Sequence, residues 1–190
     1  MMSDGSHVSS GRRETIMDAK EVAAVIDELV AEILSGVGDA RDLAAIGIRT
    51  RGVPLARRIV DRLVEATGSC IELGNVGITL YRDDIGTRFP KPVVQGTSID
   101  FDVENKRILL VDDVLFTGRT VRAALDEIVD FGRPARIELA VLIDRGHREL
   151  PIQPDYVGRR VGTSRAEMVK VRLREVDGED KVELIKYPET

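Results

Sequence analysis

Apolar positions recur along the chain at two different spacings. Between Asp18 and about Ser35 they return every three or four residues, which is the spacing of one buried face of an α-helix. Asp18 is a suitable N-cap with Glu21 three residues later, and Gly36 is expected to end this helix. Similar stripes predict a second helix that begins near Pro54 and a third over about 121–129.

Short apolar runs between these helices predict β-strands. The runs are Leu43 to Ile48, Val76 to Tyr81, Arg107 to Asp112 and Arg136 to Ile143. Because strands and helices alternate, the pattern favours an α/β fold with a parallel sheet. Near the end of the chain, 169–176 and 181–187 alternate apolar and polar residues around Asp177-Gly178, which predicts a β-hairpin.

Two polar segments stand apart from this pattern. Residues 1–13 are rich in serine and glycine and are expected to form a disordered tail, so that 14–190 would be one domain. The segment Arg82 to Thr97 contains Gly86, Pro90, Pro92 and Gly96, and it is expected to be a long loop. Long loops in compact domains are often functional lids.

Composition indicates where in the cell the protein is expected. No apolar run approaches the roughly 18 residues that a membrane-spanning helix needs, and no secretory signal is visible, so no membrane partner is expected. Cys70 is the only cysteine, which excludes an internal disulfide and favours a structural role for that residue. A cytoplasmic location is the resulting expectation.

Charge is unevenly distributed. The net charge of −5 argues against indiscriminate nucleic-acid binding. Residues 1–44 carry four basic and nine acidic side chains, whereas residues 145–174 carry eight basic and three acidic ones. The basic segment indicates either a face for phosphate or nucleic acid or a chance clustering of surface charges.

The stretch RILLVDDVLFTGRT, Arg107 to Thr120, carries the strongest chemical signal. Asp112 and Asp113 follow a buried strand, and ligands of open parallel sheets bind beyond the carboxyl ends of the strands. Thr117–Thr120 would begin the next helix, where free N–H groups suit a phosphate. A sugar phosphate matches both elements, because its hydroxyls suit the two acids and its phosphate suits the start of the helix. The two carboxylates also suit Mg²⁺.

Other interpretations of this stretch are weaker. Aspartates often serve as turn or cap residues, but two of them before Thr-Gly-Arg-Thr make a more specific pattern. The P-loop motif is absent, because Val53 follows Gly47 and Gly52 where lysine would be required. The glycine-rich dinucleotide motif is also absent.

The segment VDDVLFTGRTVRAAL resembles the phosphoribosyl-pyrophosphate (PRPP) signature of type I phosphoribosyltransferases. GIRTRGVPLARRI, LYRDD and LAVLIDRGHRELPIQPDYVG resemble the PyrR family, uracil phosphoribosyltransferases that also regulate pyrimidine genes. The resemblance runs from about Asp18 to Val182. It implies the type I phosphoribosyltransferase fold, a central parallel sheet flanked by helices, with a small hood from about 144–165 and a C-terminal β-hairpin.

The resemblance also implies an activity. Ribose 5-phosphate would pass from PRPP to uracil, giving UMP and pyrophosphate with Mg²⁺ as cofactor, held indirectly by Asp112 and Asp113 through PRPP and water. The residues implied at the reacting centre are Asp112, Asp113, Arg51 and Arg82. The wider substrate-binding set comprises Thr50, Arg51, Gly52, Asp112, Asp113, Val114, Leu115, Phe116, Thr117, Gly118, Arg119, Thr120, Arg145 and Val157. Thr50–Gly52 match a pyrophosphate loop that often contains a non-proline cis peptide.

The family's regulatory activity implies binding of leader RNA from pyrimidine genes. The candidate RNA contacts are His147, Arg148, Arg159, Arg160 and Arg165. His147 is equally a candidate for a base contact or for a structural histidine. The first predicted helix carries five acids against Lys20, which favours the alternative of an enzyme without RNA attenuation.

Two further alternatives remain from the sequence. One is a nucleotide-sensing RNA regulator with residual catalysis, and the other is a phosphoribosyltransferase for a different base. The resemblance implies a homodimer as the minimum unit, or a tetramer.

Overall fold

The structure is a computed structural model that describes residues 11–37, 40–80, 92–94 and 96–187. The strands are β1 Arg12–Met17, β2 Leu43–Ile48, β3 Glu72–Val76, β4 Ile78–Leu80, β5 Pro92–Val94, β6 Arg107–Leu115, β7 Arg136–Asp144, β8 Tyr156–Arg160, β9 Met168–Arg172 and β10 Lys181–Lys186. The helices are α1 Ala19–Val37, α2 Gly52–Thr67, α3 Arg119–Asp130 and α4 Arg174–Asp177.

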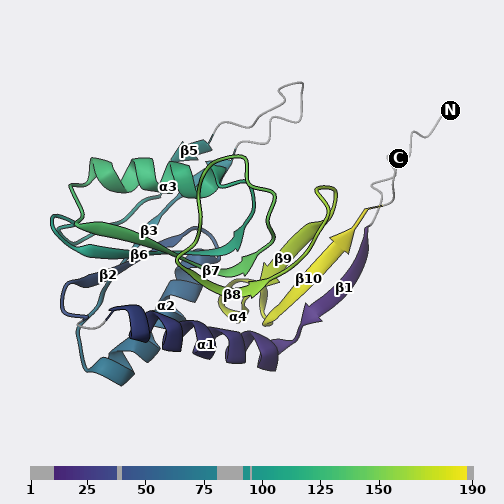
Figure 1. Cartoon of the computed structure of the whole chain (residues 1–190), viewed down its shortest axis with the longest axis horizontal. Helices are drawn as coiled ribbons and strands as arrows, with labels where there is room; N and C mark the ends of the chain where they lie inside the picture. Colours follow the sequence, from purple (N-terminus) through teal and green to yellow (C-terminus); the bar gives the residue numbers. More distant parts are fainter. Residues whose placement is uncertain (1–10, 38–39, 81–91, 95, 188–190) are drawn as a thin grey trace.

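A central parallel sheet of order β3-β2-β6-β7-β8 forms the middle layer. Figure 1 shows α3 over one face of this sheet and α1 and α2 over the other. All six residues of β2 are buried, as are Ile108 to Asp112 in β6. Strands covered on both faces read as continuous apolar runs, so the short apolar segments of the sequence correctly predicted the α/β class with a parallel sheet.

Helix α1 begins as the sequence predicted. The Oδ1 atom of Asp18 accepts hydrogen bonds from the backbone N–H groups of Lys20 at 2.8 Å and Glu21 at 2.9 Å. Glu21 Oε2 in turn accepts from the Asp18 N–H at 2.8 Å, which completes a capping box. The helix continues to Val37, so the expected stop at Gly36 was wrong by one residue.

We expect Asp18→Ala to lower the free energy of unfolding by about 1 kcal/mol, because it leaves helical N–H donors without a partner. Urea denaturation measures the effect. Asp18→Asn is the matched control, since asparagine caps helices as well as aspartate does. Equal losses in both variants would contradict a capping role.

Two strands of the main sheet were missed. β3 precedes the expected strand at Val76–Tyr81, where the structure has the short β4 instead. β8 pairs with β7 in the main sheet, so the expected hood at 144–165 was wrong over 156–160. β8 reads YVGRR, which has little apolar character, and its conformation comes from pairing with β7.

The expected lid loop, Arg82 to Thr97, also contains a strand. β5 pairs antiparallel with β4, and Ile78 lies opposite Val94. Residues 81–91 and 95 lie outside the described residues, so most of the expected lid, including Arg82, does too.

A second, antiparallel sheet of order β1-β10-β9 lies beside the main one (Figure 1). The predicted C-terminal hairpin is confirmed, although its strands are shorter and α4 lies in the connection. β1 was not predicted, and it pairs Arg12 with Lys186 and Arg13 with Ile185. The expected tail boundary at residue 13 was therefore wrong, and residues 1–10 lie outside the described residues.

No helix in the described part of the chain is both long and apolar enough to cross a membrane.

Candidate functional site

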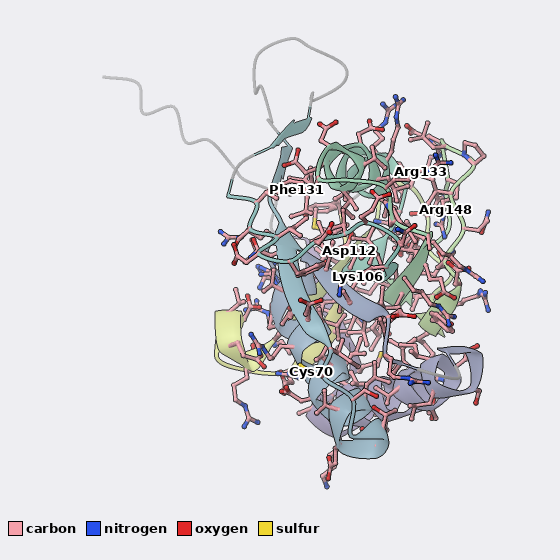
Figure 2. All side chains as sticks on the ribbon, turned by 90° about the vertical axis from the view of Figure 1, so that its left-hand side faces the viewer. Cys70, Lys106, Asp112, Phe131, Arg133 and Arg148 are labelled. Carbon is pink, nitrogen blue, oxygen red and sulfur yellow. The ribbon has the colours of Figure 1, made fainter. Side chains whose placement is uncertain are left out.

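The two acids lie within β6 rather than after it. The strand continues to Leu115 beside β7, so the predicted end at Asp112 was wrong by three residues. On the other side, the pairing of β6 with β2 stops at Val111 opposite Gly47. Asp112 and Asp113 thus lie in the part of β6 that continues beyond its pairing with β2. Figure 2 shows Asp112 in the interior, between α3 and the layer that contains α2.

The pKa values of Asp112 and Asp113 depend mainly on how far each carboxylate is buried. Asp112 is 6% exposed, and its Oδ1 accepts the backbone N–H of Asp113 at 2.9 Å. Burial raises the pKa of Asp112 well above its ordinary range, and the negative charge of Asp113 adds to this. Burial also raises the pKa of Asp113, while the Asp112 hydrogen bond and the positive charge of Arg51 oppose the rise. Such a pair is favourable for hydroxyl donors or a nearby cation.

We expect Asp112→Asn to stabilise the fold at pH 7. The folded-state pKa of Asp112 lies above its unfolded value, so wild-type stability is lost as pH rises through the folded pKa. Asparagine keeps an Oδ1 acceptor for the Asp113 N–H without the buried charge. The stability that Asp112→Asn gains over the wild type should shrink as the pH falls toward the ordinary aspartate pKa of about 4. Urea midpoints between pH 4 and 8 measure this, and a variant destabilised equally at every pH would contradict it.

Glycines allow the loop after β2 to pack against β6. A Cβ on Gly52 would lie 2.5 Å from the Val111 carbonyl oxygen, and one on Gly47 would lie 2.6 Å from the Gly52 carbonyl oxygen. Real Cβ atoms do not approach so closely, so larger residues at either position would push the loop away from the acids. The expected non-proline cis peptide is present, between Arg49 and Thr50.

Arg51 in this loop lies near the acids. Its Nε and Nη2 donate to the two carboxylate oxygens of Asp177 at 2.9 and 2.7 Å. This hydrogen-bonded pair lowers the pKa of Asp177 to about 2 and raises the pKa of Arg51, to which Asp113 also contributes. Arg51 and Asp113, both expected at the reacting centre, thus lie within electrostatic range of each other. Arg82, its predicted companion, lies outside the described residues.

The loop between β6 and α3 is shaped for an anion. Gly118 has φ +89° and precedes the first turn of α3, so the backbone N–H groups that follow lie at a helix N-terminus. Thr117 Oγ1 accepts the Arg119 N–H at 3.4 Å. The Arg119 side chain is bound to Glu149, with Nε and Nη2 at 2.9 and 2.8 Å from Oε2. Thr120 lies in the same first turn.

The segment 145–152, which follows β7, packs along this loop between β6 and α3. The Thr117 carbonyl oxygen accepts the N–H groups of Glu149 at 3.0 Å and Leu150 at 3.2 Å. A Cβ on Gly118 would lie 3.3 Å from Ile152 Cβ. The sequence analysis missed Glu149 and Ile152, because no local motif marks contacts across about 30 residues.

Arg145 directly follows β7 and lies between Phe116, in the loop after β6, and the segment after β8. It is 6% exposed, and its guanidinium stacks over the Phe116 ring at 4.1 Å from the ring centroid. Its Nε donates to Thr163 Oγ1 at 3.2 Å and its Nη2 to the Ser164 carbonyl oxygen at 2.8 Å. Burial lowers the pKa of Arg145.

A cavity of about 330 Å³ opens beside Arg145, within the size range of small-molecule sites. The residues that line it are Asp144, Arg145, Gly146, His147, Arg160, Val161, Gly162 and Thr163. Val157 does not line it. Val157 pairs with Val141 in the sheet and its side chain packs into the apolar cluster on the α3 side, so the expected base contact from the backbone near Val157 stays a prediction.

The candidate RNA residues fall into two groups. Arg148 is bound within the fold, where it donates to Asp144 at 2.7 Å and to the carbonyl oxygens of Phe116, Ile152 and Gly146. His147 Nε2 lies 2.6 Å from the Thr163 carbonyl oxygen, which matches its structural alternative. Neither side chain is placed as a free RNA contact.

The remaining candidates, Arg159, Arg160 and Arg165, are exposed. Arg165 lies 3.4 Å from Glu149, the same carboxylate that binds Arg119. Cys70 is exposed and, in Figure 2, lies well away from Asp112, so the site does not involve it.

Known proteins resemble this chain over most of its length. Residues 12–173 match the family model of the phosphoribosyl transferase domain. Bifunctional protein PyrR of Chloroflexus aurantiacus is 53% identical over 176 residues, which cover 93% of this chain and 97% of that protein. Bifunctional protein PyrR of Clostridioides difficile is 52% identical over 167 residues, covering 88% and 94%.

A solved hypoxanthine phosphoribosyl transferase of Trypanosoma cruzi superposes with a TM-score of 0.70 at 15% identity, covering 97% of this chain and 95% of that one. At that identity, the likeness shows a shared fold.

Proposed function

Because the chain belongs to the phosphoribosyl transferase family and, within it, to the PyrR proteins, we propose that it converts uracil and PRPP to UMP and pyrophosphate and regulates pyrimidine genes. The observation that carries the enzymatic part is the pair of buried Asp112 and half-buried Asp113, between a loop that suits an anion and Arg51. Each of these elements matches one part of PRPP: the ribose hydroxyls, the 5-phosphate and the pyrophosphate.

In this proposal, different parts of the site bind different parts of PRPP. The ribose hydroxyls donate to Asp112 and Asp113, and the 5-phosphate accepts N–H groups from 117–120. Arg51 faces the pyrophosphate from the loop after β2. These contacts hold the ribose so that its C1 is presented to the base.

The reaction breaks the bond between ribose C1 and pyrophosphate while N1 of uracil forms the new bond to C1 and loses its proton to the solvent. Negative charge grows on the leaving group, and Arg51 stabilises it. No covalent nucleophile is required, because the leaving group departs as the base attacks. The protein therefore acts through orientation and electrostatics.

Mg²⁺ fits this donor set, because the neighbouring carboxylates of Asp112 and Asp113 offer oxygen ligands. The described residues contain no group of three or more side chains able to hold a metal, so we assign the two acids an indirect role through PRPP and water. When bound, Mg²⁺ supplies positive charge to the pyrophosphate.

We assign uracil to the cavity beside Arg145. The buried guanidinium is held by Thr163, Ser164 and the Phe116 ring, so it is a rigid donor for a carbonyl oxygen of the base. Initial rates with uracil, orotate, hypoxanthine and guanine test this assignment. We expect turnover with uracil, and a preference for a purine would contradict it.

The regulatory part of the proposal assigns leader RNA to the exposed arginines at the end of β8 and after it, which are Arg159, Arg160 and Arg165. These exposed arginines suit phosphate contacts, which weaken steeply as salt rises. The second candidate is an enzyme without RNA attenuation, which the exposed acids Asp27, Glu28 and Glu32 on α1 favour. Titration with pyrimidine leader RNA at low and high salt separates the two, since the enzyme-only candidate predicts no saturable binding.

A homodimer and a cytoplasmic location complete the proposal. Light scattering of the purified protein tests the first, and cell fractionation tests the second.

A further inference from the structure

The connection between β9 and β10 is docked on α2 and the loop before it by ion pairs. Arg58 donates from Nε and Nη2 to Glu175 at 2.8 and 2.7 Å, and from Nη2 to Asp180 at 2.7 Å. Arg51 lies seven residues earlier, two helical turns away on the same side, and binds Asp177. Asp177 is the member of this connection that reaches the proposed pyrophosphate loop.

Asp177 is itself held firmly. Its side chain is 11% exposed, and its Oδ2 accepts the backbone N–H of Leu173 at 3.0 Å in addition to the Arg51 Nε. Because its pKa is lowered to about 2, it stays ionised across the neutral range. The carboxylate is thus a fixed negative charge against which the Arg51 guanidinium is aligned.

The geometry of the pair leaves Arg51 able to meet an anion. Asp177 engages the Nε–Nη2 edge of the guanidinium side-on. A guanidinium has five N–H donors in a rigid fork, so its other edge keeps donors for a ligand. On the ligand side, the positive charge of Arg51 opposes the rise in the pKa of Asp113, and the charge of Asp113 adds to the effect of Asp177 in raising the pKa of Arg51.

We propose that Asp177 is a positioning residue for pyrophosphate: it fixes the guanidinium of Arg51, 126 residues away in sequence, in the orientation that meets the leaving group. This inference rests on the proposed function. Free arginine side chains sample many rotamers, and fixing one in advance removes that entropy cost from ligand binding.

The test compares Asp177→Asn with Glu175→Gln, a matched control that removes a partner of Arg58 and leaves the Arg51 pair intact. We expect Asp177→Asn to lower kcat/KM for PRPP about 10-fold with the KM for uracil unchanged, and Glu175→Gln to change neither. In an Arg51→Gln background, Asp177→Asn should have no further effect, because the two changes remove one interaction. Wild-type kinetics in Asp177→Asn, equal losses in both single variants, or additive losses in the double variant would overturn the proposal.

Calorimetric titration with Mg²⁺ and pyrophosphate tests the same idea without turnover. Asp177→Asn should bind pyrophosphate more weakly than Glu175→Gln does. Tighter binding would overturn the proposal, since Asp177 would then compete with pyrophosphate for Arg51. If the wild type binds pyrophosphate but does not consume PRPP and uracil, the proposed function fails, and this titration still decides the role of Asp177. Should Asp177→Asn not fold, Asp177→Glu, which displaces the carboxylate by one methylene, takes its place in both tests.

Discussion

Asp113→Asn is expected to lower kcat/KM for PRPP by about 100-fold while leaving the fold intact. Hydrogen bonds to a charged group contribute about 1.5–3 kcal/mol, and every 1.4 kcal/mol corresponds to a factor of ten. The variant loses the charged acceptor for a ribose hydroxyl and also the negative charge beside Arg51. Asparagine has nearly the same volume as aspartate, so packing in β6 should be preserved.

Initial rates at varied PRPP concentration measure the loss, and circular dichroism checks the fold. Asp126→Asn is the matched control, because Asp126 lies exposed on α3, where it forms an ion pair with Arg122. The control should retain wild-type rates. An unchanged kcat/KM in folded Asp113→Asn would refute the assignment of PRPP to this site.

Gly52→Ala is expected to reduce activity by about 100-fold and to lower the free energy of unfolding by about 1–3 kcal/mol. The added Cβ would lie 2.5 Å from the Val111 carbonyl oxygen, so the loop or β6 must move. Either movement displaces Arg51 from the acids, and a displacement of about 1 Å can cost about 100-fold in rate.

Val64→Ala, at an exposed position of the same helix, is the control for introducing alanine into α2. Urea denaturation and initial rates are measured on both variants. Alanine is a better helix former than glycine. A Gly52→Ala protein that is fully active, or more stable than the wild type, would therefore show that the close packing of this loop does not matter.

Features encoded by contiguous residues were predictable from the sequence. Buried parallel strands appear as apolar runs, so Leu43 to Ile48 matched β2 at both ends. The capping of α1 depends on Asp18 and Glu21, three residues apart, and was also predicted. The motif from Asp112 to Thr120 was recognisable in the sequence because its acids, glycine and threonines follow one another, and its role in binding PRPP stays a prediction.

Features that depend on distant partners were not predictable in this way. β1 reads RRETIM and forms a strand because β10 offers it an edge about 170 residues later. Arg148 resembles a free basic residue in the sequence, but it donates to the carbonyl oxygen of Phe116 after β6 and to those of Gly146 and Ile152 in its own segment. Asp177 appeared to be a hairpin turn residue, and only the structure shows it against Arg51.

The side chain of Val157 shows the same limit. The family resemblance pointed to the backbone near Val157 for the base, and the structure places the Val157 side chain in the apolar core. The cavity beside Arg145 lies further along and is lined by residues at and after the ends of β7 and β8. Which residue of a segment faces a cavity depends on strand register, and that register was not available from the sequence.

The central claim is that the acids of β6, the loop at 117–120 and Arg51 together bind and cleave PRPP. Incubation of the purified protein with Mg²⁺, uracil and PRPP labelled in the ribose tests it most directly, with UMP and pyrophosphate quantified in parallel. The account predicts labelled UMP and pyrophosphate in equal amounts, both dependent on uracil. PRPP that stays intact in the presence of the folded protein would contradict it.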